Sequence, residues 1–151
     1  MTVTIERAPV NQAAYAEVFE LLLEEYREVS HIRFSPDKTA KAAYRVLAEG
    51  MTFLVRAPDG TPAGTLGLSE MEYWFADETF LQDRWFYVRP AYRGGEYGKA
   101  LIRAAKDEAE RLGKIVYLTI QNPDRRAKTH RMMLESQECG FVPFGYTIRI
   151  R

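Results

Sequence analysis

The sequence predicts an α/β fold in which one sheet is layered with helices. Strand-like and helix-like segments alternate along the chain, and the apolar, β-branched run at 115–120 is typical of a strand covered on both faces. The length of 151 residues and the hydrophobic content of 46% suit a single compact domain, residues 1–151.

The first 50 residues predict a strand followed by two helices. Residues 2–7 alternate as a short strand, and Asn11 is a suitable N-cap for a helix that covers 15–29. The buried face of this helix is marked by apolar residues at three- and four-residue steps: Tyr15, Val18, Phe19, Leu22, Leu23, Tyr26 and Val29. A second helix begins at the Ser-Pro-Asp signal of 35–37 and stops at Gly50.

Three strands come next. Residues 51–57 and 63–71 form a hairpin, because Asp59 and Gly60 between them supply the positive-φ chemistry that a tight turn requires. A third strand over 79–88 ends just before a proline.

The second half predicts two further helices and two strands. The helix over 98–112 places its apolar residues on one side and ends at Gly113. The strand at 115–120, a helix over 126–138 and a final strand over 146–151 complete the chain. The predicted order is therefore β, α, α, β, β, β, α, β, α, β.

Composition narrows the classes of partner. Lys plus Arg equals Asp plus Glu at 21 each, so no net field attracts nucleic acid or an anionic membrane. The single cysteine, Cys139, cannot form an internal disulfide, and no basic-then-apolar leader or long apolar run is present. We therefore expect a cytoplasmic protein with no nucleic-acid or membrane partner. The two histidines, His31 and His130, have no spaced companions, so no metal site is expected.

The stretch VRPAYRGGEYGKAL, residues 88–101, joins a predicted strand to a predicted helix through a glycine-rich loop. Such a junction leaves backbone N–H groups free at the helix start, with the positive end of the helix dipole behind them. Gly94 and Gly95 allow close approach of a ligand, Gly98 opens the helix, and Arg93 adds a planar fork of donors. The pattern predicts an anion site, most simply for a diphosphate.

Other readings of this loop fit less well. A P-loop needs four residues between its glycines and a hydroxyl after the lysine, whereas three residues lie between Gly94 and Gly98 and Ala100 follows Lys99. A dinucleotide fingerprint needs an acidic residue at the end of the next strand, but amides follow Ile120. A tight turn without any ligand stays open from the loop alone.

The segment YVRPAYRGGEYGKALI resembles the acetyl-CoA-binding segment of the GNAT N-acetyltransferase superfamily. The matching residues are Val88 and Pro90 at the strand end, Arg93, Gly94 and Gly98 in the loop, and Ala100 and Leu101 at the helix start. Glu96 departs from the pattern, because it stands where the middle glycine usually lies and Gly95 comes one place early. This R-G-G-x-x-G arrangement is similar to that of phage-type members.

The resemblance spans nearly the whole chain, since the predicted element order and the Cys-Gly-Phe of 139–141 are also similar to the family. It implies one GNAT-like mixed sheet with helices on both faces, and acetyl-CoA as acyl donor with no metal. The two strands beside the loop would splay so that the pantetheine arm lies between them. The residues implied to contact the cofactor are Phe86, Val88, Arg93, Gly94, Gly95, Glu96, Tyr97, Gly98, Lys99 and Thr129.

Acyl transfer to an amine needs a group that removes a proton and donors for the oxyanion and the departing thiolate. By resemblance, the acidic base is expected at Asp83 first and at Glu72 second, with Glu70 nearby. A main-chain N–H near Phe86 or Val88 would face the thioester oxygen.

The residue that would protonate the thiolate departs from the family. Where many members carry a tyrosine, this chain has Ser136. Either Tyr146, Tyr97 or a water takes over that role, or the thiolate leaves without a dedicated donor.

We therefore expect an acetyl-CoA-dependent N-acetyltransferase that transfers the acetyl group directly to a primary amine in a ternary complex. Two alternatives remain: an acyl-CoA-binding or interaction module with little activity, and a structural domain that binds no anion. The segment 71–80 carries Glu72, Asp77 and Glu78, which favours a cationic acceptor. Dimers are common in the family, so a homodimer is the assembly to test.

Overall fold

The computed structural model describes residues 3–28, 33–119 and 125–142, with only the backbone described at 125–127. The chain comprises two compact units, residues 1–119 and residues 120–151. The first unit holds a sheet and three α-helices, and α4 (Arg125–Glu135) belongs to the second. In the described ranges, no helix combines the length and the apolar character needed to cross a bilayer.

The sheet of the first unit is mixed. Its strands lie in the order β1-β2-β3-β4-β5, with antiparallel neighbours from β1 to β4 and a parallel pair at the β4–β5 edge. Their bounds are β1 Thr4–Arg7, β2 Thr52–Arg56, β3 Pro62–Glu72, β4 Thr79–Val88 and β5 Val116–Tyr117.

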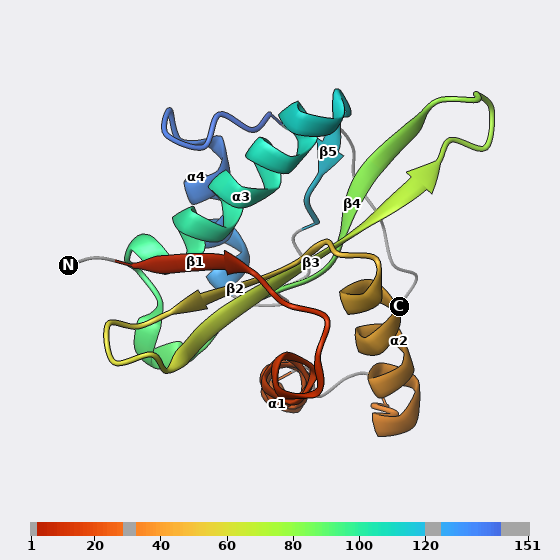
Figure 1. Ribbon diagram of the computed structural model, residues 1–151. Helices are drawn as coiled ribbons and strands as arrows, with labels where there is room; N and C mark the ends of the chain where they lie inside the picture. The colour runs from red at the N-terminus through yellow and green to blue at the C-terminus, as the bar shows by residue number, and fades with distance from the viewer. Residues whose placement is uncertain (1–2, 29–32, 120–124, 143–151) are drawn as a thin grey trace. The chain divides into compact units, whose positions relative to one another are not determined.

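Helices cover both faces of this sheet (Figure 1). The helices α1 (Gln12–Glu28) and α2 (Pro36–Ala48) pack on one face and α3 (Glu96–Leu112) packs on the other, preceded by a short 3₁₀ turn at Pro90–Tyr92. Each face has its own apolar core, because side chains alternate across a strand: Leu66, Leu68 and Leu81 face α3, whereas Leu54, Trp85 and Tyr87 face α1 and α2. The predicted α/β class, with a mixed sheet and helices on both faces, is confirmed.

Local sequence signals begin the two N-terminal helices. The Asn11 side chain accepts the Ala14 N–H at 2.8 Å, and the Ser35 hydroxyl accepts the Lys38 N–H at 3.4 Å. Such caps satisfy donors that the first helical turn leaves unpaired and stabilise a helix by about 1 kcal/mol. The predicted N-cap at Asn11 and the predicted helix start at 35–37 are confirmed, although α1 begins at Gln12, before the predicted range of 15–29.

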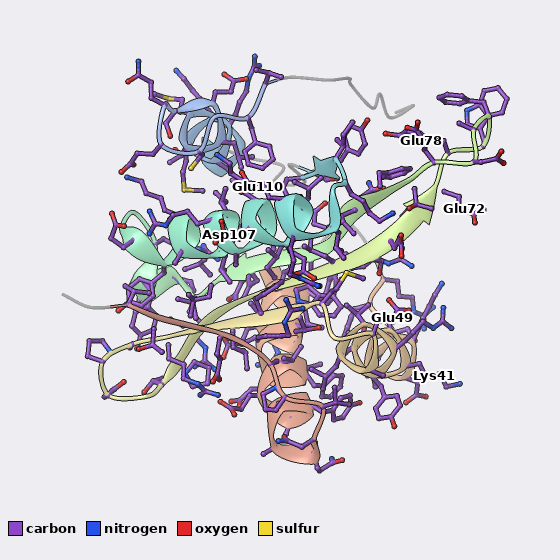
Figure 2. The ribbon with its side chains drawn as sticks, turned by 45° about the horizontal axis from the view of Figure 1, so that its top comes forward. Lys41, Glu49, Glu72, Glu78, Asp107 and Glu110 are labelled. Carbon is purple, nitrogen blue, oxygen red and sulfur yellow. The ribbon has the colours of Figure 1, made fainter. Side chains whose placement is uncertain are left out.

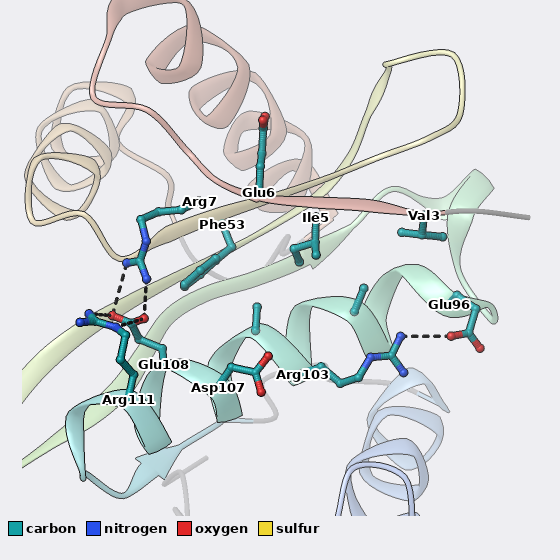
Figure 3. A pocket seen from close by; sticks show the side chains of 12 residues that line it. Val3, Ile5, Glu6, Arg7, Phe53, Glu96, Arg103, Asp107, Glu108 and Arg111 are labelled. Carbon is teal, nitrogen blue, oxygen red and sulfur yellow. Dashed lines mark hydrogen bonds and ion pairs between the residues drawn. The ribbon is translucent and has the colours of Figure 1, made fainter.

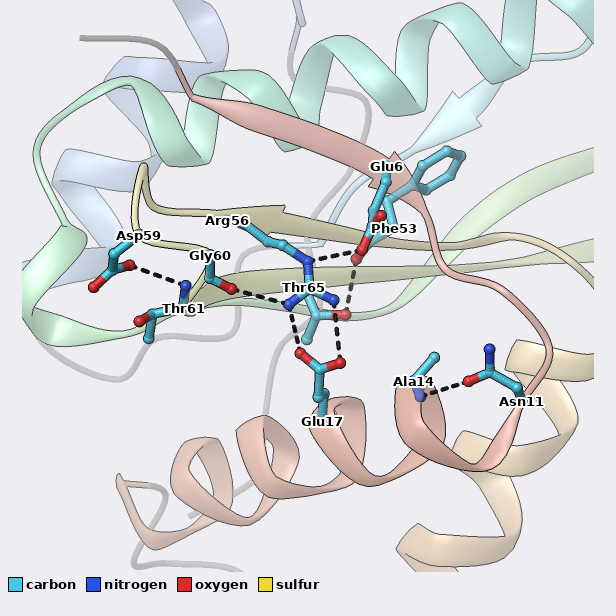
Figure 4. A network of polar contacts seen from close by, with 10 residues as sticks. All are labelled: Glu6, Asn11, Ala14, Glu17, Phe53, Arg56, Asp59, Gly60, Thr61 and Thr65. Carbon is cyan, nitrogen blue, oxygen red and sulfur yellow. Dashed lines mark hydrogen bonds and ion pairs between the residues drawn. The ribbon is translucent and has the colours of Figure 1, made fainter.

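The β2–β3 turn also forms as predicted. Gly60 adopts φ +88°, and the Asp59 carboxylate accepts the Thr61 N–H at 3.0 Å. Beside this turn, Arg56 donates to Glu6 at 2.8 Å and to Glu17 at 2.6 Å, which ties β1 and α1 to β2 (Figure 4).

A second ion network joins β1 to α3. Glu108 is 3% exposed, and its carboxylate accepts hydrogen bonds from Arg111 at 2.6 Å and from Arg7, which hold its pKa down at about 2 (Figure 3). A groove of about 580 Å³ runs beside this network between β1 and α3 (Figure 3).

The boundaries of three predicted elements were wrong. The helix α3 begins at Glu96 rather than at Gly98, because Gly95 takes the N-cap position with an extended backbone. Within the described residues, the strand expected over 115–120 comprises Val116 and Tyr117, and Ile115 just before it is 59% exposed. The helix expected over 126–138 ends at Glu135. The strand expected over 146–151 lies outside the described residues.

Candidate active site

The strands β4 and β5 pair only briefly within the described residues. Leu81 is opposite Val116 and Gln82 is opposite Tyr117, after which β4 continues to Val88 without a further β5 partner. An irregularity in the β3–β4 register, opposite Gly67 and Leu68, lies at the same level. A bulge of this kind bends a strand and turns its edge away from a neighbour, so the sheet opens on the β5 side of β4.

Asp83 lies where the two strands part. Its carboxylate accepts the main-chain N–H of Thr119 at 3.0 and 3.1 Å through its two oxygens. Burial raises the pKa of Asp83 to about 6, and the hydrogen bonds from Thr119 oppose that rise. A carboxylate with a pKa near 6 is ionised at neutral pH and is basic enough to accept a proton, as a general base must be.

A second half-buried carboxyl group, that of Glu25, faces the same region from the end of α1. Burial raises its pKa to about 8, and the neighbouring charges of Glu28 and Asp83 add to the rise while Arg93 opposes it. Glu25 Oε2 is buried and has no hydrogen-bond partner in the part of the chain that the structure describes. At pH 7 the pair therefore consists of an ionised Asp83 and a protonated Glu25, the kind of divergence typical of acid–base sites.

Sequence reasoning missed Glu25, although a signal was present. Glu25 lies four residues after Leu21 and three after Leu22, both fully buried, so it continues the buried stripe of α1. A carboxyl group on such a stripe has to be neutral or paired, and this marks it as a candidate functional residue.

The loop before α3 has the geometry of an anion site. Gly94 adopts φ +81°, and a Cβ added at Gly94 or Gly95 would meet no atom within 4 Å. The first N–H groups of any α-helix lack an intrahelical acceptor. In α3 the N-cap residue is Gly95, which has no side chain, so no cap side chain accepts from these N–H groups. Backbone donors, the helix dipole and open space thus coincide, as a phosphate group requires.

The side chain of Arg93 is already engaged. It donates to the Val88 carbonyl at 2.7 Å and to the Glu28 carboxylate at 3.0 and 3.1 Å, and its guanidinium lies 5.5 Å from the centre of the Tyr87 ring. This arrangement fastens the end of β4 to α1. To contact a phosphate group, the Arg93 guanidinium would have to break its hydrogen bonds with the Glu28 carboxylate and donate to the ligand instead.

The departure at Glu96 is compensated by nearby cations. Its carboxylate accepts from Arg103 at 3.2 Å and lies 3.9 Å from the Lys99 ammonium group, on the side of α3 that faces the groove (Figure 3). Tyr97 is 4% exposed and packs edge-on against Tyr92 at 5.1 Å between ring centres. Its hydroxyl group therefore belongs to the core, and only its main chain lies in the loop.

The two other acidic candidates lie away from Asp83. Glu72 is exposed and pairs with Thr79, four residues along β3 from the partner of Asp83, which corresponds to about 13 Å. Glu70 accepts from Thr79 at 2.7 Å and from Lys114 at 2.8 Å, and these contacts lower its pKa. Of the three acidic residues expected from the sequence, Asp83, Glu72 and Glu70, only Asp83 lies at the opening of the sheet.

The main chain of β4 faces the opening at alternate residues. Because the Arg89 N–H bonds to Ala63 of the β3 side, the peptide groups of Val88 and Phe86 are directed away from β3. This orientation agrees with their expected role beside a pantetheine arm, although Arg93 occupies the Val88 carbonyl.

The remaining candidates belong to the second unit. Thr129 is exposed on α4, and the Ser136 hydroxyl donates to the Met133 carbonyl at 2.7 Å. Tyr146 lies outside the described residues. Among the described residues, no three His, Cys, Asp or Glu side chains are grouped so that they could hold a metal ion.

The chain belongs to the acetyltransferase (GNAT) family, whose model matches residues 15–141. Members of this family are N-acetyltransferases that use acetyl-CoA, and this chain is one of them. No curated protein matches the sequence.

Solved structures share the fold at low sequence identity. A putative acetyltransferase from Pyrococcus furiosus matches with a TM-score of 0.71 and 14% identity, covering 99% of each chain. A ribosomal-protein-alanine N-acetyltransferase from Brucella melitensis biovar Abortus 2308 matches with a TM-score of 0.66 and 20% identity, covering 99% of this chain and all of the other. AAC(6')-Iy, in complex with the bisubstrate analog CoA-S-monomethyl-acetylneamine, matches with a TM-score of 0.71 and 17% identity, covering 100% and 98%.

Proposed function

We propose that this enzyme transfers an acetyl group from acetyl-CoA directly to a primary amine in a ternary complex, with Asp83 as the base. The observation that carries the proposal is the position of Asp83, a half-buried carboxylate with a pKa of about 6 at the point where β4 and β5 part. A structural relative described in complex with a CoA bisubstrate analog supports direct transfer.

The proposed seat of the cofactor uses the main chain. The N–H groups of the first turn of α3, from Gly95 to Gly98, would hold the diphosphate, with Gly94 leaving room for it. Lys99 would add charge, while the pantetheine arm would lie along Phe86 and Val88 as an added strand. Acetyl-CoA supplies an activated acyl group as a thioester. No metal is needed for this chemistry.

The proposed transfer needs few protein groups. Asp83 removes the proton that the acceptor ammonium must lose before its nitrogen can attack the thioester carbon. A main-chain N–H of β4 stabilises the oxyanion, and the carbon–sulfur bond then breaks. Because Ser136 replaces the usual tyrosine, the thiolate takes its proton from Tyr146 or from water.

The acceptor is a cationic amine in this proposal. At neutral pH the Asp83 carboxylate is ionised and the Glu25 carboxyl group is protonated, while Glu28 is paired with Arg93, so the net charge of these groups beside the opening is negative. An ammonium group entering here would meet negative charge, which an anionic acceptor could not tolerate. One structural relative is named a ribosomal-protein-alanine N-acetyltransferase, and another is described in complex with the bisubstrate analog CoA-S-monomethyl-acetylneamine, which is consistent with an amine acceptor.

The wider proposal is that residues 1–151 act as one GNAT domain in the cytoplasm, without a nucleic-acid or membrane partner. The balanced charge of 21 basic and 21 acidic residues supports this, because it supplies no net attraction to polyanions.

A binding assay combined with a turnover assay tests the function. Acetyl-CoA should raise the melting temperature, and release of free thiol should accelerate with cationic amines but not with anionic acceptors. A thermal shift without turnover on any amine would favour the alternative of an acyl-CoA-binding module. No shift at all would exclude both proposals.

A further inference from the structure

The hairpin tip, defined as residues 72–78 between β3 and β4, carries the most exposed aromatic residues of the described chain. Trp74 is 94% exposed and Phe75 is 68% exposed. In Figure 1 this hairpin extends beyond the other strands of the sheet. Singly exposed apolar residues are common, but two large neighbouring aromatic side chains on a projecting hairpin are typical of an interaction site.

The tip is built on an anchored platform. The Tyr73 hydroxyl group lies 2.9 Å from that of Tyr117, and the Tyr73 ring packs 4.5 Å from the Phe80 ring. Trp74 meets Phe75 edge-on at 5.4 Å between ring centres. Because Tyr73 is held to β4 and β5, the two exposed rings are presented by the fold rather than by a free loop.

Negative charge surrounds these rings. Glu72, Asp77 and Glu78 are exposed, and within the described ranges no Lys, Arg or His forms an ion pair with them. Figure 2 labels Glu72 and Glu78 near the end of the hairpin. Glu70, only two residues before the tip, differs because Lys114 neutralises it. The tip therefore combines aromatic faces with three uncompensated carboxylates.

We propose that the hairpin tip binds a basic polypeptide segment and that the acceptor amine is carried by the same polypeptide. Arg and Lys side chains are attracted both to aromatic faces and to carboxylates, so one basic segment satisfies both features of the tip. This inference rests on the proposed acetyl transfer, whose substrate class it narrows from a cationic amine to a basic polypeptide.

The distance between the tip and Asp83 supports a polypeptide. Glu78 and Asp83 are five residues apart along β4, which corresponds to about 17 Å of strand. An extended peptide of about five residues covers that distance. The reactive amine and the basic residues that contact the tip should therefore be separated by about five residues.

Other occupants fit the tip less well. The three carboxylates repel an anionic membrane and nucleic acid. A second copy of the chain that docked tip to tip around a two-fold axis would place the same carboxylates against each other, which like charges oppose.

Two peptides and two variants test the proposal. One peptide carries a lysine followed about five residues later by three arginines, and its partner carries three glutamines instead. The variants are Trp74→Ala with Phe75→Ala, and Asp77→Asn with Glu78→Gln. Matched controls are Tyr44→Ala, which removes an exposed ring on α2, and Asp107→Asn with Glu110→Gln, which removes two carboxylates that Figure 2 shows on α3.

Wild type should acetylate the arginine peptide with a KM about tenfold or more below that of the glutamine peptide. Both tip variants should remove this difference and leave kcat and the KM of a small monoamine unchanged, whereas the controls should retain it. Equal KM values for the two peptides in wild type, or equal losses in the tip variants and the controls, would overturn the proposal.

Direct binding separates this inference from the proposed function. If calorimetry shows tip-dependent binding of the arginine peptide but no amine is acetylated, the result supports peptide binding at the hairpin tip and contradicts the proposed acetyl transfer. If monoamines are acetylated but the tip variants bind and acetylate both peptides as wild type does, the result supports acetyl transfer and contradicts peptide binding at the hairpin tip. Sedimentation that shows a dimer dissociating on Trp74→Ala with Phe75→Ala, or tip-dependent binding to phosphatidylcholine vesicles, would assign the tip to another partner and overturn the proposal.

Discussion

Replacing Asp83 by asparagine removes the proposed base while keeping its shape. With a pKa of about 6, Asp83 is about nine-tenths ionised at pH 7 and about one-tenth ionised at pH 5. The kcat/KM of the wild type should therefore fall about tenfold between these pH values. Asp83→Asn should lower kcat by about 10² to 10⁴, the usual contribution of a general base, and should abolish the acid limb.

The same substitution should stabilise the fold. The pKa of Asp83 is raised from 3.8 to about 6, so the folded state holds this proton more tightly than the unfolded chain does. Stability conferred by the protonated form is therefore lost as the pH rises from about 4 to about 6, and above pH 6 the buried charge costs about 3 kcal/mol at 1.4 kcal/mol per pH unit. Asparagine avoids that cost.

Urea denaturation at pH 4 and pH 7, run beside the pH–rate profile, measures both effects. Asp83→Asn should be more stable than wild type at pH 7 and nearly equal to it at pH 4, while Asp107→Asn on the exposed side of α3 should change neither property. Wild-type activity with an intact acid limb in Asp83→Asn, or a lower stability of this variant at pH 7, would contradict the role and the ionisation of Asp83 proposed above.

Two further predictions concern the other residues of the site. Glu25→Gln should raise the free energy of unfolding at pH 7 by about 3 kcal/mol. The reason is that folding raises the pKa of the Glu25 carboxyl group from 4.5 to about 8, so this group destabilises the fold increasingly as the pH rises across that range. Chemical denaturation from pH 4 to pH 8 measures the effect, and a difference in stability that did not change with pH would contradict it. Gly95→Ala should weaken acetyl-CoA binding at least tenfold, because the new methyl group would occupy space that the ligand uses. The melting temperature should change little, because this methyl group meets no other atom of the protein. Calorimetry measures the affinity, and an unchanged affinity would show that the ligand does not approach Gly95.

Elements fixed by local chemistry could be predicted from the sequence. The caps at Asn11 and Ser35 and the turn at Gly60 each depend on side chains within a few residues, and all three form as expected. The start of α3 was misplaced because Gly95 and Gly98 are both able to begin a helix, and only the path of the chain after β4 selects Gly95.

Features that depend on distant residues could not be predicted. The contact between Arg93 and Glu28 joins residues 65 apart, and neither residue's neighbours signal it. The protonation of Glu25 depends on burial at the end of α1 beside Asp83, which only the packed sheet creates. Among the described residues, the length of β5 depends on where its pairing with β4 ends, which an apolar run cannot reveal.

The most direct test of the account asks whether the first turn of α3 holds the diphosphate of acetyl-CoA. Amide-proton NMR shifts of Gly95, Glu96 and Gly98 can be followed as acetyl-CoA is added to saturation. The account predicts that these amide protons move downfield together and with the affinity found by calorimetry, because each gains a charged acceptor. Saturable binding that leaves these amides unmoved would contradict it.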